Sequence, residues 1–205
     1  LKVKLLLQYN SALSACAKSA RWSRALELIE NHPPGIKSPD VVAYGTAMSA
    51  CERWGQWLYA LGLLEDLEKS NLKNDEMCLH AVIGACGRSQ EWQSALHLFT
   101  EIQRQGQRID IIALGNVMSA CERASAWQST LALLRGHKTN GVNIILYNSS
   151  ISACAKSDVW QFSLQLLGEA AQSQLQLTVI SYNAALEACE RCAEWSQALW
   201  LLAKM

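Results

Sequence analysis

The chain has 205 residues, half of them apolar, and its 18 basic side chains are balanced by 18 acidic ones. This much apolar material excludes a disordered polypeptide, and the zero net charge argues against a protein that binds nucleic acid through bulk charge alone. No apolar run approaches the ~18 residues that a membrane helix needs, so no membrane association is predicted.

An internal repeat is the dominant feature of the sequence. The dipeptide Ala-Cys recurs in steps of 35, 35, 35, 33 and 35 residues, at Ala15-Cys16, Ala50-Cys51, Ala85-Cys86, Ala120-Cys121, Ala153-Cys154 and Ala188-Cys189. Six tryptophans keep the same spacing: Trp22, Trp57, Trp92, Trp127, Trp160 and Trp195. A fixed period of this length is typical of a repeat architecture. The sequence predicts one array of six repeats, at about 6–40, 41–75, 76–110, 111–143, 144–178 and an incomplete 179–205.

Two helices are predicted in each repeat. The first is expected to begin near a large apolar residue and to run to the basic residue after the cysteine; its predicted starts are Tyr9, Tyr44, Leu79, Leu114, Tyr147 and Tyr182. In the second repeat Tyr44, Ala47, Met48 and Cys51 form the i, i+3, i+4, i+7 stripe of an amphipathic helix. The second helix is expected to start near each tryptophan. The fourth repeat is two residues shorter than the others, which predicts a clipped second helix or a tighter loop.

Helix pairs this short cannot bury an apolar face alone, whereas stacked pairs can. The predicted fold is therefore all-α, a right-handed α-solenoid with the first helices on its concave side. The sequence begins without Met and stops inside the sixth repeat, so we expect a fragment of a longer repeat array.

The repeats resemble those of the pentatricopeptide repeat family. The resemblance is carried by Tyr147-Asn148 through Ala153-Cys154-Ala155-Lys156, and by the first repeat from Tyr9-Asn10 to the closing Pro39-Asp40. It implies single-stranded RNA as the partner, with one base recognised per repeat by two or three side chains. It also implies action in a chloroplast or mitochondrion. No cofactor or small-molecule substrate is expected, although other proteins could be partners.

The resemblance also assigns residues by their place in the repeat. The first base-reading residue follows the tyrosine position: Asn10, Gly45, His80, Gly115, Asn148 and Asn183. The second ends the repeat: Asp40, Asp75, Asp110, Asn143 and Thr178. An apolar residue near the start of the repeat would pack on the base: Leu7, Val42, Met77, Ile112, Ile145 and Ile180. Only Asn10 with Asp40 is a standard pair, the one that the family associates with uracil, and the glycines have no side chain with which to recognise a base.

A cation follows each Ala-Cys cysteine by two residues, forming what we call the cation row: Lys18, Arg53, Arg88, Arg123, Lys156 and Arg191. These side chains could contact the phosphates of a bound strand, or they could complement the negative ends of the first helices. The two roles are compatible. Glutamates directly before three of the cations would weaken the positive field: Glu52, Glu122 and Glu190.

The other recurrent residues favour structural roles. The tryptophans suit packing between repeats better than base stacking, and the cysteines on the apolar face behave as small hydrophobic residues. Cys189 and Cys192 form one C-x-x-C, but no second pair completes a zinc site, so no metal is predicted. No nucleophile, base and orienting group are assembled, so no catalysis is expected within this chain.

Three functions therefore stay open. The first is a single-stranded RNA-binding protein that supports organellar RNA processing, stability or translation. The second is a scaffold for protein–protein interaction, which the neutral charge and the glycines favour. The third is the RNA-targeting arm of a larger RNA-processing enzyme.

Overall fold

The computed structural model describes residues 2–19, 21–34, 36, 38–70, 72, 75–104, 106, 111–137 and 143–204. Helices without any strand make up the regular structure of these residues, which confirms the all-α prediction. The first helices of the repeats are α1 (Lys2–Lys18), α3 (Val41–Arg53), α5 (Glu76–Arg88), α7 (Ile111–Arg123), α9 (Ile144–Lys156) and α11 (Val179–Arg191). The second helices are α2 (Trp22–Glu30), α4 (Trp57–Lys69), α6 (Trp92–Arg104), α8 (Trp127–Gly136), α10 (Trp160–Gln172) and α12 (Trp195–Leu202). None of the described helices is long and apolar enough to cross a membrane.

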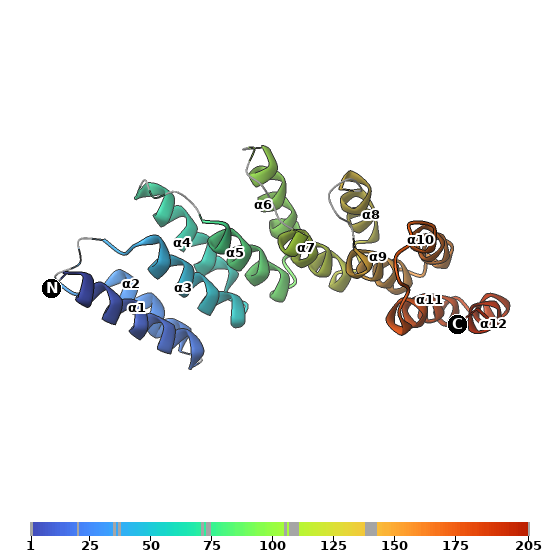
Figure 1. The fold of residues 1–205 in the computed structure, drawn as a ribbon, viewed down its shortest axis with the longest axis horizontal. Coiled ribbons are helices and arrows are strands. Elements are labelled where there is room, and N and C mark those ends of the chain that lie inside the picture. The colour runs from blue at the N-terminus through green and yellow to red at the C-terminus, as the bar shows by residue number, and fades with distance from the viewer. Residues whose placement is uncertain are drawn as a thin grey trace. The chain divides into compact units, whose positions relative to one another are not determined.

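The chain divides into two compact units, Leu1–Ile109 and Asp110–Met205, each of which holds three helix pairs. Within each unit the first helices pack side by side, as α1, α3 and α5 in one and as α7, α9 and α11 in the other (Figure 1). Each second helix packs on the first helix of its own repeat, and α2, α4, α8 and α10 also contact the first helix of the next repeat. Each unit is thus a stack of helix pairs, with the first helices as its closely packed layer, as an α-solenoid requires.

The first helices begin earlier than the sequence analysis predicted, by seven residues in α1 and by three residues, about one turn, in the other five. Helix α3 starts at Val41 and not at Tyr44, because the side chain of Asp40 caps it by accepting a 2.8 Å hydrogen bond from the Ala43 N–H. Asn143 caps α9 in the same way. The predicted ends were right, since every first helix closes on its residue of the cation row.

The second helices begin at the tryptophans, as predicted. In the fourth repeat α8 has 10 residues, fewer than the 13 of α10 but more than the 9 of α2, whose repeat has the full length. The ring of Trp22 lies 5.3 Å from that of Tyr59, and the ring of Trp127 lies 5.2 Å from that of Phe162. Both contacts join the second helices of successive repeats, which supports the packing role of the tryptophans.

The cysteines of the repeat form part of the core. All but the half-buried Cys16 are buried: Cys51, Cys86, Cys121, Cys154 and Cys189. Burial raises the pKa of four of these thiols to about 11. They therefore stay protonated at neutral pH and act as small hydrophobic residues, as expected.

Candidate nucleic-acid interface

The first helices expose a large apolar side chain at the same position of every repeat. These six residues occupy the position assigned to base packing, and each is between 60% and 67% exposed: Leu7, Val42 and Met77 in the first unit, and Ile112, Ile145 and Ile180 in the second. These side chains contribute little to the core, yet a large apolar residue occupies this position in every repeat. Repeated exposure of this kind is typical of a surface that binds a partner.

Two grooves bring packing and base-reading residues together. A groove of about 780 Å³ between α1 and α3 is lined by Leu7 and Val42, with Asn10, Asp40 and Lys18 beside them. A second groove of about 460 Å³ lies between α9 and α11. Its walls include Ile145, Ile180, Asn148 and Asn183, together with the carboxylates of Glu122 and Glu187. The same repeat positions therefore form a groove in each unit.

Asn10 and Asp40 meet in the first groove. The Asn10 Nδ2 donates to both carboxylate oxygens of Asp40, at 3.4 and 3.3 Å. The Asn10 Oδ1 is buried and has no hydrogen-bond partner, and the Oδ1 of Asn148 in the second groove is in the same state. Buried acceptors are normally satisfied, so the asparagine beside each groove has one acceptor without a partner among the described residues.

The second base-reading positions have a local role that sequence reasoning missed. Asp40, Asp75, Asn143 and Thr178 are the N-cap residues of the following first helices. A short polar residue just before an apolar run was the available signal. Asp110, at the equivalent position, lies outside the described residues.

The remaining first base-reading positions are less uniform. Asn183 is exposed at the wall of the second groove, and His80 is half-buried on α5. Gly45 is buried in α3, and Gly115 is half-buried in α7. The side chains predicted to recognise a base therefore differ in exposure from repeat to repeat, and two repeats have none at this position.

The cation row divides into exposed and paired members. Lys18, Arg53, Arg88 and Arg123 are exposed, and the Arg123 Nε also donates to the carbonyl of Ser119 at 3.2 Å. All of them end their helices, so the structure suits a dipole-complementing role as well as a phosphate-binding one.

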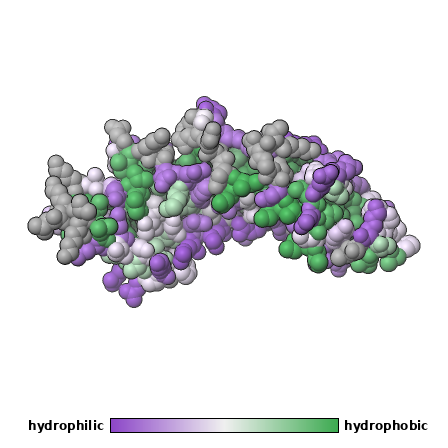
Figure 2. All heavy atoms as spheres, in the orientation of Figure 1, coloured by the Kyte–Doolittle hydropathy of each residue, from purple (hydrophilic) through white to green (hydrophobic). Residues whose placement is uncertain are grey.

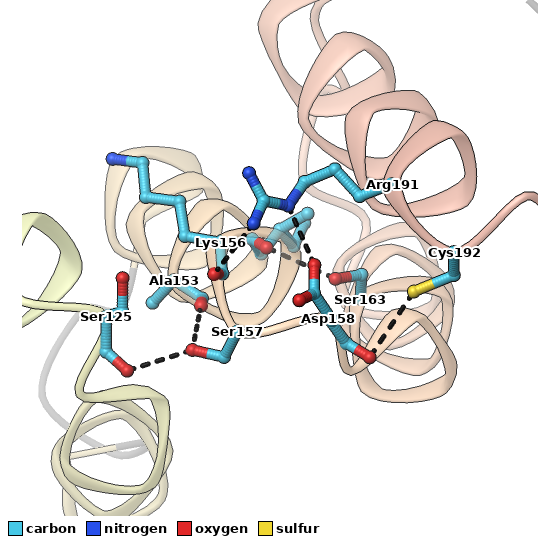
Figure 3. A network of polar contacts seen from close by, with 9 residues as sticks. Ser125, Ala153, Lys156, Ser157, Asp158, Ser163, Arg191 and Cys192 are labelled. Atoms are coloured by element: carbon cyan, nitrogen blue, oxygen red, sulfur yellow. Dashed lines mark hydrogen bonds and ion pairs between the residues drawn. The ribbon is translucent and has the colours of Figure 1, made fainter.

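Two cations of the second unit are paired with carboxylates. The Lys156 Nζ lies 3.0 Å from the Glu122 Oε1, and the Arg191 Nε lies 2.8 Å from the Asp158 Oδ1. Figure 3 shows the guanidinium of Arg191 turned toward Asp158, while the Lys156 side chain extends away from it. Each carboxylate belongs to the repeat before its cation, so adjacent repeats share these charges.

Glu52 and Glu122 act mainly on the repeat that follows their own. Glu122 accepts from Ser152 at 2.8 Å as well as from Lys156. Its equivalent in the first unit is Glu52, whose pKa is raised by burial and lowered most by Arg88 of the next repeat. The predicted weakening of the positive field is present, but its main target is the cation of the following repeat.

Neither unit has a single uniform face. Hydrophilic and hydrophobic patches lie among one another in the space-filling view (Figure 2). Among the described residues, no group of three or more His, Cys, Asp or Glu side chains could hold a metal ion.

Comparison with known proteins places these features in a family context. The PPR repeat family matches residues 9–31, 42–72 and 78–107. No curated protein sequence matches the chain. The crystal structure of the pentatricopeptide repeat protein PPR10 from maize is similar, with a TM-score of 0.75 and 22% identity over 96% of this chain and 28% of that one.

Two further structures show the same fold. PPR10 in complex with an 18-nt psaJ RNA element gives a TM-score of 0.70 and 24% identity, over 90% of this chain and 28% of that one. The PPR domain of Arabidopsis thaliana protein-only RNase P 1, in complex with tRNA, gives a TM-score of 0.65 and 10% identity, over 77% of this chain and 84% of that one. The chain thus spans about 28% of the length of the PPR10 chains.

Proposed function

Because three segments of this chain match the pentatricopeptide repeat family and its fold is similar to that of PPR10, we propose that it binds single-stranded RNA along the first helices of its repeats. The observation that carries the proposal is the pairing, in each unit, of exposed apolar residues with an unsatisfied asparagine carbonyl in one groove. The similar PPR10 and RNase P domain structures hold RNA, which supports the same partner class here.

A base would enter the first groove with its faces against Leu7 and Val42. Its edge would meet Asn10, whose carbonyl accepts, and Asp40, whose carboxylate also accepts. Uracil presents one N–H between two carbonyls, which suits an amide beside a carboxylate. The phosphates would follow the exposed members of the cation row, such as Lys18 at the wall of the groove.

The chain acts in this proposal as a binding scaffold and not as an enzyme. Occupying an RNA strand would support its processing, stability or translation, either alone or as the targeting arm of a larger protein. The family likeness favours a chloroplast or mitochondrion as the place of action.

Fluorescence polarisation with labelled single-stranded RNA of random sequence tests the proposal. Replacing Leu7 and Val42 with Ser should weaken binding severalfold without unfolding the protein, because both side chains are exposed. The matched control replaces Leu58 of α4 and Leu199 of α12, which are 64% and 59% exposed on second helices, and should leave the affinity unchanged. Absence of RNA binding by the wild-type protein would refute the proposal and favour a scaffold for protein–protein interaction.

A further inference from the structure

Side-chain size alternates at the junctions between successive first helices. The first base-reading residue is large and polar in repeats one, three and five, and it is glycine in repeats two and four. Inside a unit, such a residue faces a residue near the start of the next first helix, and the size of that facing residue changes in the opposite direction. Within the first unit these facing residues are Ala43 and Cys78, and within the second unit they are Leu146 and Ser181. Inside each unit a small residue thus follows the polar reader, and a larger one follows the glycine.

The structure shows direct contact at both glycine junctions. A Cβ added at Gly45 would lie 3.4 Å from the Cys78 Sγ, and one added at Gly115 would lie 3.8 Å from the Leu146 Cδ2. Cys78 and Leu146 are each only 1% exposed. Each therefore occupies space beside its glycine, and a side chain longer than a methyl group would compete with it for that space.

The polar junctions have the opposite arrangement. Asn10 and Asn148 line grooves, and each keeps a buried carbonyl without a partner. The facing residues, Ala43 and Ser181, are too small to fill such a groove. These junctions offer both the room and the hydrogen-bonding group that the glycine junctions lack.

We infer that the array discriminates the bases of a bound strand at every second repeat, and that Cys78 and Leu146 are the residues that close the intervening positions. This inference rests on the proposed function. A base at a glycine repeat is still held by its faces, because Val42 and Met77 are both exposed beside that junction. Its edge meets no reading side chain, so any base is accepted there. The alternation covers repeats one to five, since the sixth repeat carries Asn183.

A binding selection of the wild-type protein on randomised single-stranded RNA tests the period. Positions with a base preference of about fivefold or more should alternate with positions that accept all four bases. Two adjacent positions with equal preferences among repeats one to five, or a bound pool with no preference at any position, would overturn the inference while leaving RNA binding intact. Failure to retain any RNA would overturn the proposed function itself.

Paired substitutions test the closing residues. Gly45→Asn alone and Cys78→Ala alone should create no new preference, because the first leaves the space filled and the second supplies no reader. The double variant should gain one new preferred position between those of repeats one and three. A gain by Gly45→Asn alone, or none by the folded pair, would refute the role of Cys78.

The reverse exchange provides an independent variant in the second unit. Replacing Asn148 with Gly and Ser181 with Cys reproduces the Gly45–Cys78 junction and should erase the preference of repeat five. Thermal unfolding followed by circular dichroism checks that each variant is folded. Retention of the repeat-five preference by the folded variant would contradict the inference.

Discussion

Replacing Glu122 with Gln should strengthen RNA binding, because it releases Lys156 from an ion pair. The Lys156 ammonium lies 3.0 Å from the Glu122 carboxylate, and the two side chains are only 32% and 22% exposed. A glutamine keeps the length of the side chain, and its carbonyl can still accept from Ser152. The substitution therefore removes the charge with little change in packing.

The magnitude follows from counterion release. Each phosphate contact to a single strand contributes a slope of about −0.7 to log affinity against log salt, so six cations would give about −4. Lys156 and Arg191 are paired with carboxylates, so the wild-type slope should be nearer −3. Freeing Lys156 should move it to about −3.5. The gain in affinity from one added contact is at most about eightfold at 50 mM salt and about threefold at 200 mM.

The assay is fluorescence polarisation with labelled oligouridylate across this range of salt. Glu190→Gln is the matched control, because Glu190 holds the same repeat position and is exposed, while the cation beside it pairs with Asp158 instead. Both substitutions raise the net charge by one. A difference between the two salt slopes must therefore come from the local release of Lys156. Equal slopes for the two variants would refute the reasoning and leave Lys156 with a purely structural role.

Three further predictions concern the first unit and its neighbour. Asp40→Asn should retain the helix cap but lower the uracil preference at that position by about fivefold or more in a selection experiment, and an unchanged preference would remove Asp40 from base recognition. Replacing Arg53, Arg88 and Arg123 with Ala should take about 2 from the slope of the salt titration, whereas an unchanged slope would restrict them to completing the helix ends. Burial raises the pKa of Glu52, so its ionised form costs stability at neutral pH and this cost fades as the pH falls through the folded-state pKa. Glu52→Gln should therefore raise the unfolding temperature at neutral pH and lose this advantage in acid, and a pH-independent difference would contradict the burial argument.

The repeat and its helices could be predicted from the sequence because their markers are packing residues. Cys51 and its equivalents fill the core, and Trp22 and Trp127 pack between second helices, so each must recur at a fixed spacing. The predicted starts of most first helices lie about one turn too late, because the sequence analysis did not treat the polar residue before each helix as its N-cap. Asp40 was assigned to base recognition by the family resemblance, and its capping of α3 was not considered.

Contacts between repeats were beyond the sequence analysis. Glu122 and Lys156 are 34 residues apart, and only the register of α7 against α9 brings them together. Gly45 suggested a lost reading function for the same reason, since nothing in its own repeat shows that Cys78 packs against it. A period is visible in one chain, whereas the faces that successive repeats turn toward each other depend on their packing.

Charge follows the same two-repeat period as side-chain size. Glu52 and Glu122 belong to the glycine repeats, yet their electrostatic effects fall on the next repeat, where Glu52 interacts with His80 and Glu122 lines the groove of Asn148. In a glycine repeat the space beside the glycine is thus occupied by the next first helix. The same repeat supplies a carboxylate to the polar repeat that follows. A carboxylate accepts hydrogen bonds and repels phosphate, so it favours a base edge rich in N–H donors at that groove. The first groove has Lys18 and no such glutamate, which means that identical asparagines at positions 10 and 148 face different electrostatic surroundings. Under the proposed function the physical unit of recognition is a pair of repeats, and the base preference expected at Asn148 depends on the repeat that precedes it.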